Sequence, residues 1–160
     1  MRRLLTGLLV WLLAACAPQP QESLPPLSVT GTDGRPTVLA PGPQRFTLIN
    51  VWAPWCPPCV AEMPSLDRLA GLAPELRVVG LAPDQNRLLA DEFLRKHGIR
   101  FPTYFGSEDL ITNTLGVQVF PVTLLVAPDG RVLARAAGAR EWDSAATRDW
   151  LQAMIERARG

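Results

Sequence analysis

The sequence predicts an α/β protein, a three-layer sandwich in which helices cover both faces of a mixed central sheet, with a β-hairpin at its N-terminal side. The chain has 160 residues, of which 48% are hydrophobic and 19% charged, enough for one domain with a substantial core. Apolar runs of strand length alternate with segments of helical periodicity between residues 45 and 115. A hairpin pattern and an amphipathic segment follow, and this order is typical of a layered α/β fold.

The first fifteen residues are typical of an export signal. Arg2 and Arg3 precede the apolar run Leu8–Leu13, which is too short to span a bilayer. Removing residues 1–15 takes away two arginines and no acid, so fourteen basic and fifteen acidic residues remain and the formal charge becomes −1. This balance leaves no excess of basic residues to attract nucleic acid, and we expect no nucleic-acid partner.

The apolar run ends in LLAAC, and Leu13–Cys16 resemble the bacterial lipobox, in which the cysteine is acylated and becomes the first residue of the mature protein. The alternative is an ordinary signal peptide that leaves Cys16 as a free thiol. Residues 16–26, rich in proline and glutamine, are predicted to be an extended tether, and residues 27–160 to be the folded domain. We therefore expect an exported, lipid-anchored protein at the periplasmic or outer face of a bacterial cell membrane.

The domain is predicted to begin with a hairpin and a buried strand. Leu27–Thr30 and Thr37–Leu39 flank the pair Asp33-Gly34, which favours a tight turn because glycine tolerates positive φ. Arg45–Trp52 is almost continuously apolar or β-branched, the pattern of a central strand that is covered on both faces.

The next segments alternate between helical and strand patterns. From Cys59 to Leu72 apolar residues recur at helical spacing, and Pro64 should bend this helix because its ring clashes with a carbonyl of the preceding turn. Further elements are predicted as a strand at 76–83, a helix at 86–97, a short strand near 101–105, a helix at 108–115, two strands around the turn at 128–130, and a C-terminal amphipathic helix.

Two cysteines lie at the predicted turn between the central strand and its helix, in the motif WAPWCPPC. Such a pair can be a redox couple, half of a metal site or two buried thiols. With Trp55 beside the pair, Pro64 five residues after it and Pro121 in FPVTLLVAPDG far downstream, the chain resembles the thioredoxin superfamily over about residues 27–160.

Three further features are similar to the membrane-tethered TlpA/ResA-like branch of that superfamily. They are Asn50 before the motif, the CxxCxxExP pattern from Cys56 to Pro64, and the additional helix before residue 101. The resemblance implies an exported thiol:disulfide oxidoreductase that needs no cofactor, and cytochrome c maturation is the leading context. It also implies disulfide-containing exported proteins as substrates and a membrane thiol donor, and we expect a monomer.

The positions of the two cysteines predict separate roles in a redox-active disulfide. Cys56 lies just before the helix in an exposed position, where unpaired amides and the helix dipole stabilise a thiolate, so it is the predicted nucleophile. Cys59 lies one turn inward and is the predicted resolving thiol. Neither Pro57 nor Pro58 can donate a backbone hydrogen bond to the Cys56 sulfur, so the disulfide is favoured and we expect a reductase.

A proton acceptor for the buried thiol is predicted in the same helix. Thioredoxin has an aspartate six residues before the nucleophile, but Asn50, which cannot titrate, stands there. Glu62 lies three residues after Cys59 on the same helical face and resembles the glutamate that the TlpA/ResA-like branch places beside its thiols. The alternative is that Glu62 is an ordinary solvated acid of the first helical turn.

Substrate binding is predicted around Pro121, which resembles the cis-proline that faces the cysteines and offers backbone groups to an extended segment. The alternative is a trans proline of an edge strand. Trp55 and Phe120 are predicted to border the same groove, although Phe120 is bulkier than the residue that is common there.

Two other functions fit parts of the sequence. One is a copper-binding chaperone of the same fold, but only His97 could add a ligand to the two thiols, so no metal site is predicted. The other is a disulfide-forming oxidant, which differs from a reductase in its reduction potential. A peroxidase of related fold is rejected because Ala53 stands where a threonine or serine should orient the peroxide.

Overall fold

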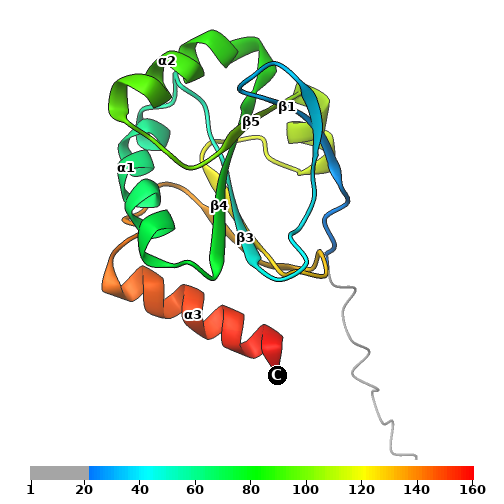
Figure 1. Cartoon of the computed structure of the whole chain (residues 1–160), viewed down its shortest axis with the longest axis vertical. Helices are drawn as coiled ribbons and strands as arrows, with labels where there is room; N and C mark the ends of the chain where they lie inside the picture. Colours follow the sequence, from blue (N-terminus) through cyan, green and yellow to red (C-terminus); the bar gives the residue numbers. More distant parts are fainter. Residues whose placement is uncertain (1–21) are drawn as a thin grey trace, which may run out of the picture.

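The computed structural model describes residues 22–160, so the predicted export signal, Cys16 and the first part of the predicted tether lie outside the described residues. Seven strands form one sheet in the order β2-β1-β5-β4-β3-β6-β7 (Figure 1). The strands are β1 (Leu27–Gly31), β2 (Pro36–Leu39), β3 (Phe46–Val51), β4 (Leu76–Pro83), β5 (Thr103–Gly106), β6 (Val122–Val126) and β7 (Val132–Ala137).

The helices are α1 (Pro57–Leu72), α2 (Arg87–His97) and α3 (Ala145–Arg159), with short turns η1 (Asp84–Asn86) and η2 (Leu110–Thr114) between them. Within residues 22–160, no helix has the length and apolar character needed to cross a membrane. The predicted mixed α/β fold with its N-terminal hairpin is confirmed.

The strand pairing makes the sheet mixed. β3, β4 and β5 run parallel to one another, whereas β6 pairs antiparallel with β3, and the two hairpins β1–β2 and β6–β7 are antiparallel. All six residues of β3 are buried, as expected for a strand covered on both faces. Its last residue, Val51, pairs with Leu81 of β4 and Val122 of β6, so the C-terminal end of β3 lies in the interior of the sheet.

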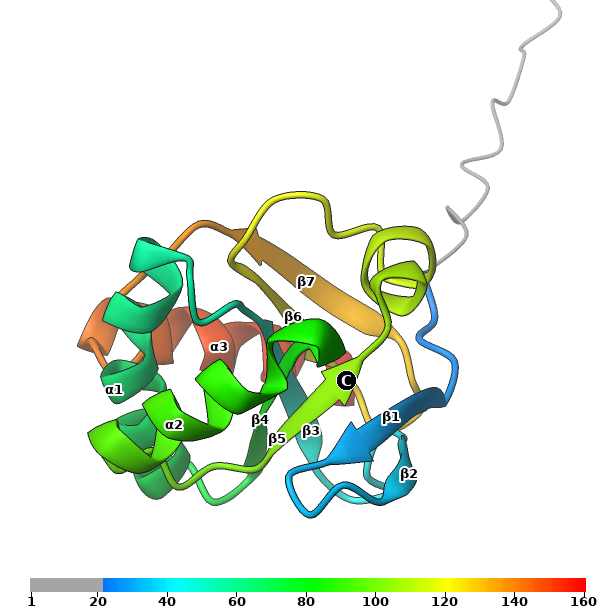
Figure 2. The same ribbon diagram turned by 90° about the horizontal axis from the view of Figure 1, so that it is seen from above.

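All three α-helices pack on one face of the sheet (Figure 2). The crossovers β3-α1-β4 and β4-α2-β5 advance in the same direction, and right-handed crossovers of this kind leave both helices on one side. On the opposite face, buried residues of the strands pack with η2 and with Leu24, so the second helical layer that the sequence predicted consists of this short helical segment. The helix predicted at 108–115 is present over residues 108–114: it begins with an α-type bond from Ile111 N–H to Ser107 C=O at 3.1 Å and passes into the π-helical turn η2, in which Leu115 N–H donates to Leu110 C=O at 2.9 Å. Gly116 follows with positive φ.

The residues that precede β1 in the sequence are already attached to the sheet. Leu24 is buried and its N–H donates to Gly130 C=O at 2.8 Å, while Val132 N–H donates to Glu22 C=O at 2.8 Å. The Glu22 carboxylate also pairs with Arg135 of β7. Residues 22–26 were predicted to be tether with nothing to bury, but Glu22 and Leu24 already belong to the folded unit because the outer edge of β7 offers them partners.

Candidate active site

The two cysteines of the motif are joined by a disulfide at the N-terminus of α1, directly after the loop that follows β3. Their Cα atoms lie 5.3 Å apart. Cys56 is the N-cap of α1, and its sulfur accepts a hydrogen bond from Cys59 N–H at 3.3 Å. Pro57 and Pro58 occupy the first helical positions, where a missing N–H removes no intrahelical bond. The turn therefore closes the loop between the sulfurs without disturbing the helix.

The disulfide is less accessible than the sequence predicted. Cys56 is 5% exposed and Cys59 is fully buried, so Cys56 is the outer of the two thiols but does not have the open position expected of it. Trp55 beside Cys56 is 58% exposed, and its ring meets the ring of Phe120 edge to face, with 5.6 Å between the centroids.

The Phe120–Pro121 peptide bond is cis, as the resemblance implied. Val122 pairs with Val51, so Pro121 lies at the same end of the sheet as the disulfide. The Pro121 carbonyl accepts a hydrogen bond from Gly138 N–H at 2.9 Å. Among the described residues no backbone hydrogen bond engages the N–H or C=O of Phe120, so these groups remain available beside the disulfide.

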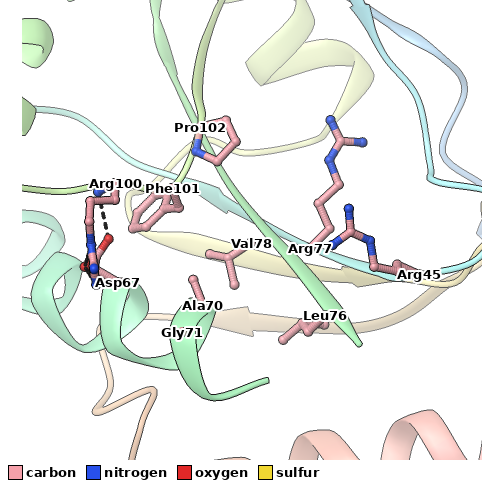
Figure 3. Close-up of a pocket in the computed structure, with 10 residues that line it drawn as sticks. All are labelled: Arg45, Asp67, Ala70, Gly71, Leu76, Arg77, Val78, Arg100, Phe101 and Pro102. Atoms are coloured by element: carbon pink, nitrogen blue, oxygen red, sulfur yellow. Dashed lines mark hydrogen bonds and ion pairs between the residues drawn. The ribbon is translucent and has the colours of Figure 1, made fainter. Parts of the chain in front are cut away.

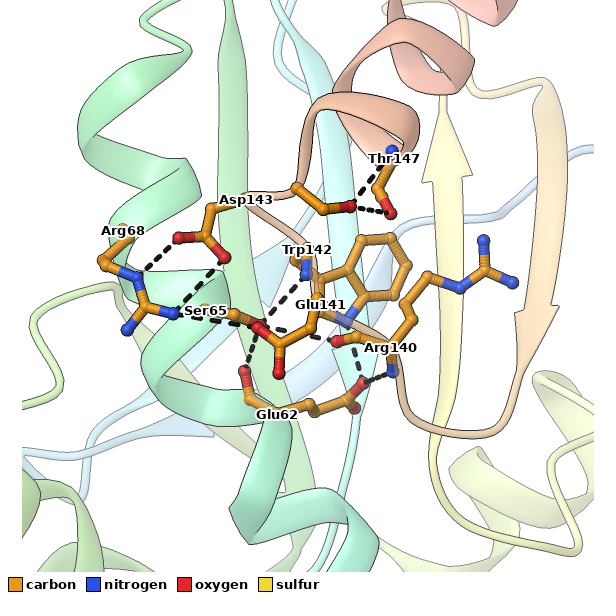
Figure 4. A network of polar contacts seen from close by, with 9 residues as sticks. Glu62, Ser65, Arg68, Arg140, Glu141, Trp142, Asp143 and Thr147 are labelled. Atoms are coloured by element: carbon orange, nitrogen blue, oxygen red, sulfur yellow. Dashed lines mark hydrogen bonds and ion pairs between the residues drawn. The ribbon is translucent and has the colours of Figure 1, made fainter.

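Glu62 is buried, with 3% of its surface exposed, so the alternative of an ordinary solvated acid is wrong. Three donors surround its carboxylate, and two of them, Trp142 and Arg140, are drawn in Figure 4. Asn50 Nδ2 donates to Oε1 at 2.8 Å, Trp142 Nε1 donates to Oε2 at 2.8 Å, and the Arg140 backbone N–H donates to Oε2 at 3.2 Å. Cys59 and Glu62 are three residues apart in α1, which places them on one side of the helix.

The protonation of Glu62 is shifted by its surroundings. Burial, the largest influence, raises the pKa of the carboxyl group, because the charged form loses its hydration. The hydrogen bonds from Trp142, Asn50 and Arg140 and the charge of Arg140 stabilise the carboxylate and lower the pKa, but the net pKa stays above its ordinary value. A carboxyl group with a raised pKa on the same side of the helix as Cys59 is suited to accept and return a proton when the disulfide is reduced.

The sequence identified Glu62 and Asn50 but not their remaining partners. Trp142, fully buried, comes from the segment between β7 and α3, and no spacing rule relates a tryptophan to a glutamate eighty residues earlier. A bond between Trp142 N–H and Ser65 Oγ at 3.1 Å, and an ion pair between Arg68 and Asp143 at 2.5 Å, fasten this segment to α1 (Figure 4). The residues that surround the Glu62 carboxylate are therefore brought together by tertiary packing.

A separate pocket of about 430 Å³ lies toward the C-terminal part of α1, beside the start of β4 and the segment before β5 (Figure 3). Asp67 and Arg100 form part of its wall, with 2.8 Å between Arg100 Nη2 and Asp67 Oδ2. Burial alone raises the pKa of Asp67, but the hydrogen bonds from Arg100 outweigh it and lower the pKa. Neither cysteine nor Glu62 lines this pocket, so it is distinct from the disulfide site.

In the part of the chain that the structure describes, no three histidine, cysteine, aspartate or glutamate side chains gather in a group that could hold a metal ion. His97 is exposed at the end of α2, and its ring stacks on Phe93 with 4.3 Å between the centroids. It therefore has a packing partner on its own helix.

A family model described as Redoxin matches residues 19–151, which include the disulfide, Glu62 and Pro121. The chain belongs to the Redoxin family. Among relatives of this redoxin is the thiol-disulfide oxidoreductase ResA of Bacillus anthracis, 28% identical over 119 residues that cover 73% of this chain and 69% of that protein. The sporulation thiol-disulfide oxidoreductase A of Bacillus subtilis is 24% identical, covering 81% of this chain and 82% of that protein.

Solved structures show the same fold. A thiol:disulfide interchange protein of the thioredoxin family from Chlorobium tepidum superimposes with a TM-score of 0.69 at 22% identity, covering 88% of this redoxin and 97% of that chain. The predicted place in the thioredoxin superfamily, in its TlpA/ResA-like branch, is thereby confirmed. This redoxin is a thiol:disulfide oxidoreductase, and disulfide-containing proteins are the substrates that its family implies.

Proposed function

We propose that this redoxin is an exported, membrane-anchored reductase of protein disulfides, in which Cys56 attacks, Cys59 resolves and Glu62 handles the proton of Cys59. The proposal that the protein is a reductase rests on one observation: the Cys56 sulfur has few hydrogen-bond donors around it. Its backbone donor is Cys59 N–H, at 3.3 Å, and both intervening residues are prolines without an N–H. A weakly stabilised thiolate favours the disulfide, so the reduced protein is the better electron donor.

The reaction has two exchange steps. The Cys56 thiolate attacks one sulfur of the substrate disulfide, that S–S bond breaks, and one substrate sulfur leaves as a thiolate that takes up a proton. Cys59 then gives its proton to Glu62, and its thiolate attacks the Cys56 sulfur, which releases the second substrate sulfur and forms the Cys56–Cys59 bond. Two electrons pass from the two cysteines to the substrate, and a membrane dithiol donor restores the reduced protein.

Substrate binding is assigned to the edge formed by Trp55, Phe120 and Pro121. Since the Pro121 carbonyl is engaged by Gly138 N–H, Phe120 is the residue that can pair its backbone with an extended substrate segment. The exposed Trp55 ring adds an apolar surface beside the disulfide. An unfolded or extended cysteine-containing segment is therefore the expected substrate form, and apocytochrome c is the leading candidate.

The location and the anchor are proposed from the N-terminal sequence. Residues 1–15 have the features of an export signal, and acylation of Cys16 would hold the mature protein at the periplasmic or outer face of the membrane. The attachment of Glu22 and Leu24 to the sheet shortens the free tether to about six residues, or roughly 20 Å when fully extended. The domain is expected to act as a monomer close to the membrane.

The reduction potential tests the direction. The soluble domain is equilibrated with glutathione and with thioredoxin, and the fraction of the Cys56–Cys59 disulfide is measured at each ratio of reductant to oxidant. A potential below roughly −200 mV supports a reductase. A value near −120 mV, that of a strong oxidant, would instead make this protein a disulfide-forming enzyme.

A further inference from the structure

The two oxygens of the Glu62 carboxylate have different surroundings. Oε2 accepts hydrogen bonds from Trp142 Nε1 at 2.8 Å and from the Arg140 backbone N–H at 3.2 Å, whereas Oε1 accepts one from Asn50 Nδ2 at 2.8 Å. An oxygen that already accepts two N–H groups has little capacity left for a proton. A proton that reaches Glu62 is therefore expected on Oε1, on the side of Asn50.

The carboxamide of Asn50 is arranged for the ionised form of Glu62. Its Nδ2 donates to Glu62 Oε1 and to Thr123 Oγ1, the latter at 2.9 Å, so both amide hydrogens are used. Its Oδ1 is buried and has no hydrogen-bond partner within the described residues, which is costly for a carbonyl oxygen. Once Oε1 carries a proton, Nδ2 faces another donor and that hydrogen bond is lost.

A turn of the amide by 180° resolves this conflict. The two ends of a carboxamide have nearly the same shape, so either can occupy the same space. In the turned state Asn50 Oδ1 accepts from the protonated Oε1 and from the Thr123 hydroxyl. Asn50 thus keeps two hydrogen bonds in both protonation states, and in the turned state its NH₂ group occupies the place where Oδ1 had no hydrogen-bond partner.

We propose that Asn50 is a two-state positioning residue, which donates to Glu62 Oε1 when the carboxyl is ionised and turns to accept from it when it is protonated. Trp142 and Arg140 hold Oε2 in both states. This inference rests on the proposed function of Glu62 as the proton acceptor of Cys59. In that step a proton leaves the Cys59 sulfur and binds Oε1, which yields a thiolate and a carboxylic acid, and no electron moves.

Several other charged or titratable groups influence the same carboxyl. Glu62 lines an open pocket of about 220 Å³ between α1 and the segment before α3, where it can exchange protons with water. The charged neighbours from that segment are Arg140 and Glu141, and reduction adds the thiols of α1. From the strands beneath α1, the uncharged Asn50 of β3 bonds the carboxyl, and Thr123 of β6 bonds Asn50 in turn.

Nuclear magnetic resonance of the reduced protein tests the amide turn. The side-chain amide signals of Asn50 should move between two limits at the same pH midpoint as the carboxyl carbon of Glu62, and the contacts between its amide hydrogens and Thr123 should weaken at low pH. The variant Glu62→Gln imitates the protonated acid, because its carbonyl can serve Trp142 and Arg140 while its NH₂ faces Asn50. Its Asn50 signals should stay at the low-pH limit at every pH.

Either of two results would overturn the proposal. One is that the Asn50 signals in the wild type keep the same amide contacts while Glu62 titrates. The other is that the signals of Glu62→Gln match the high-pH limit of the wild type. The proton-acceptor role fails by a different measurement, in which Glu62→Gln leaves the pH dependence of disulfide exchange unchanged. The two failures are therefore distinguishable.

The role of the Trp142 indole N–H is tested with a matched pair of variants. Trp142→Phe keeps an aromatic ring but removes the indole donor, so the pH midpoint of Glu62 should rise by about one unit. Trp150 also lies against the Arg140 guanidinium, 5.2 Å from it, but makes no hydrogen bond to Glu62, so Trp150→Phe should leave the midpoint in place. Equal midpoints in the two variants would refute the role of the indole N–H.

Discussion

Replacing Glu62 by glutamine should remove the loss of stability that the oxidised wild-type protein suffers as pH rises through the pKa of this carboxyl group. The folded protein holds the carboxyl at a raised pKa, whereas the unfolded chain titrates it at the ordinary value of about 4.3. Between these two values the folded state binds a proton that the unfolded state has lost. The contribution of Glu62 to stability is therefore full below the unfolded pKa and is lost as pH rises through the folded pKa.

The slope of this loss has a physical upper limit. A single group that is protonated only in the folded state lowers the free energy of unfolding by at most about 1.4 kcal/mol per pH unit. Glutamine has the same shape, can accept from Trp142 and Arg140, and carries no charge to desolvate. The free energy of unfolding of Glu62→Gln should thus increase relative to that of the wild type as pH rises above about 4.3.

Urea unfolding of the oxidised proteins between about pH 3 and pH 9 measures this difference, because neither Cys56 nor Cys59 titrates while they are joined. Asp67→Asn in the same helix is the control of opposite sign. Arg100 lowers the pKa of Asp67, so its contribution is present above the unfolded pKa and is lost as pH falls. A difference between wild type and Glu62→Gln that is independent of pH, or that moves in the direction of the Asp67 control, would refute the reasoning.

Three further outcomes are expected. Cys59→Ala should accumulate mixed disulfides with substrates on Cys56, seen as adducts on non-reducing gels, and adducts mainly from Cys56→Ala would reverse the two roles. Cys16→Ala should abolish labelling by a fatty-acid analogue and sedimentation with membranes, and a variant that is labelled as well as the wild type would rule out the anchor. Glu22→Gln should weaken the half-exposed ion pair with Arg135. Amide protons of the attached segment should then exchange faster with solvent, while the free energy of unfolding falls by less than about 1 kcal/mol. Unchanged amide exchange would show that the backbone hydrogen bonds alone hold the segment.

Features that depend on neighbouring residues could be predicted from the sequence. The buried strand that runs into a helix at the two cysteines follows from an apolar run and a change of period within a few residues. The hairpin turns follow from glycine after aspartate, as at Gly34 and Gly130, both of which have positive φ. Glu62 was placed on the same helical face as Cys59 by helical spacing and by the resemblance to the TlpA/ResA-like branch, and the resemblance of Pro121 to a cis-proline rested on a short local motif.

Other features were decided by contacts between segments that are distant in the chain. The hydrogen bonds that hold Glu62 come from β3 and from the segment before α3, and no periodicity in the sequence relates those segments. The attachment of Glu22 to β7 likewise depends on the hydrogen-bonding groups that the edge of the sheet leaves free. Local sequence patterns determine the helices and strands and the position of the thiols. Burial of a charged group depends on hydrogen-bond donors that meet it only after the chain has folded. Tertiary structure alone therefore determined the environment of Glu62.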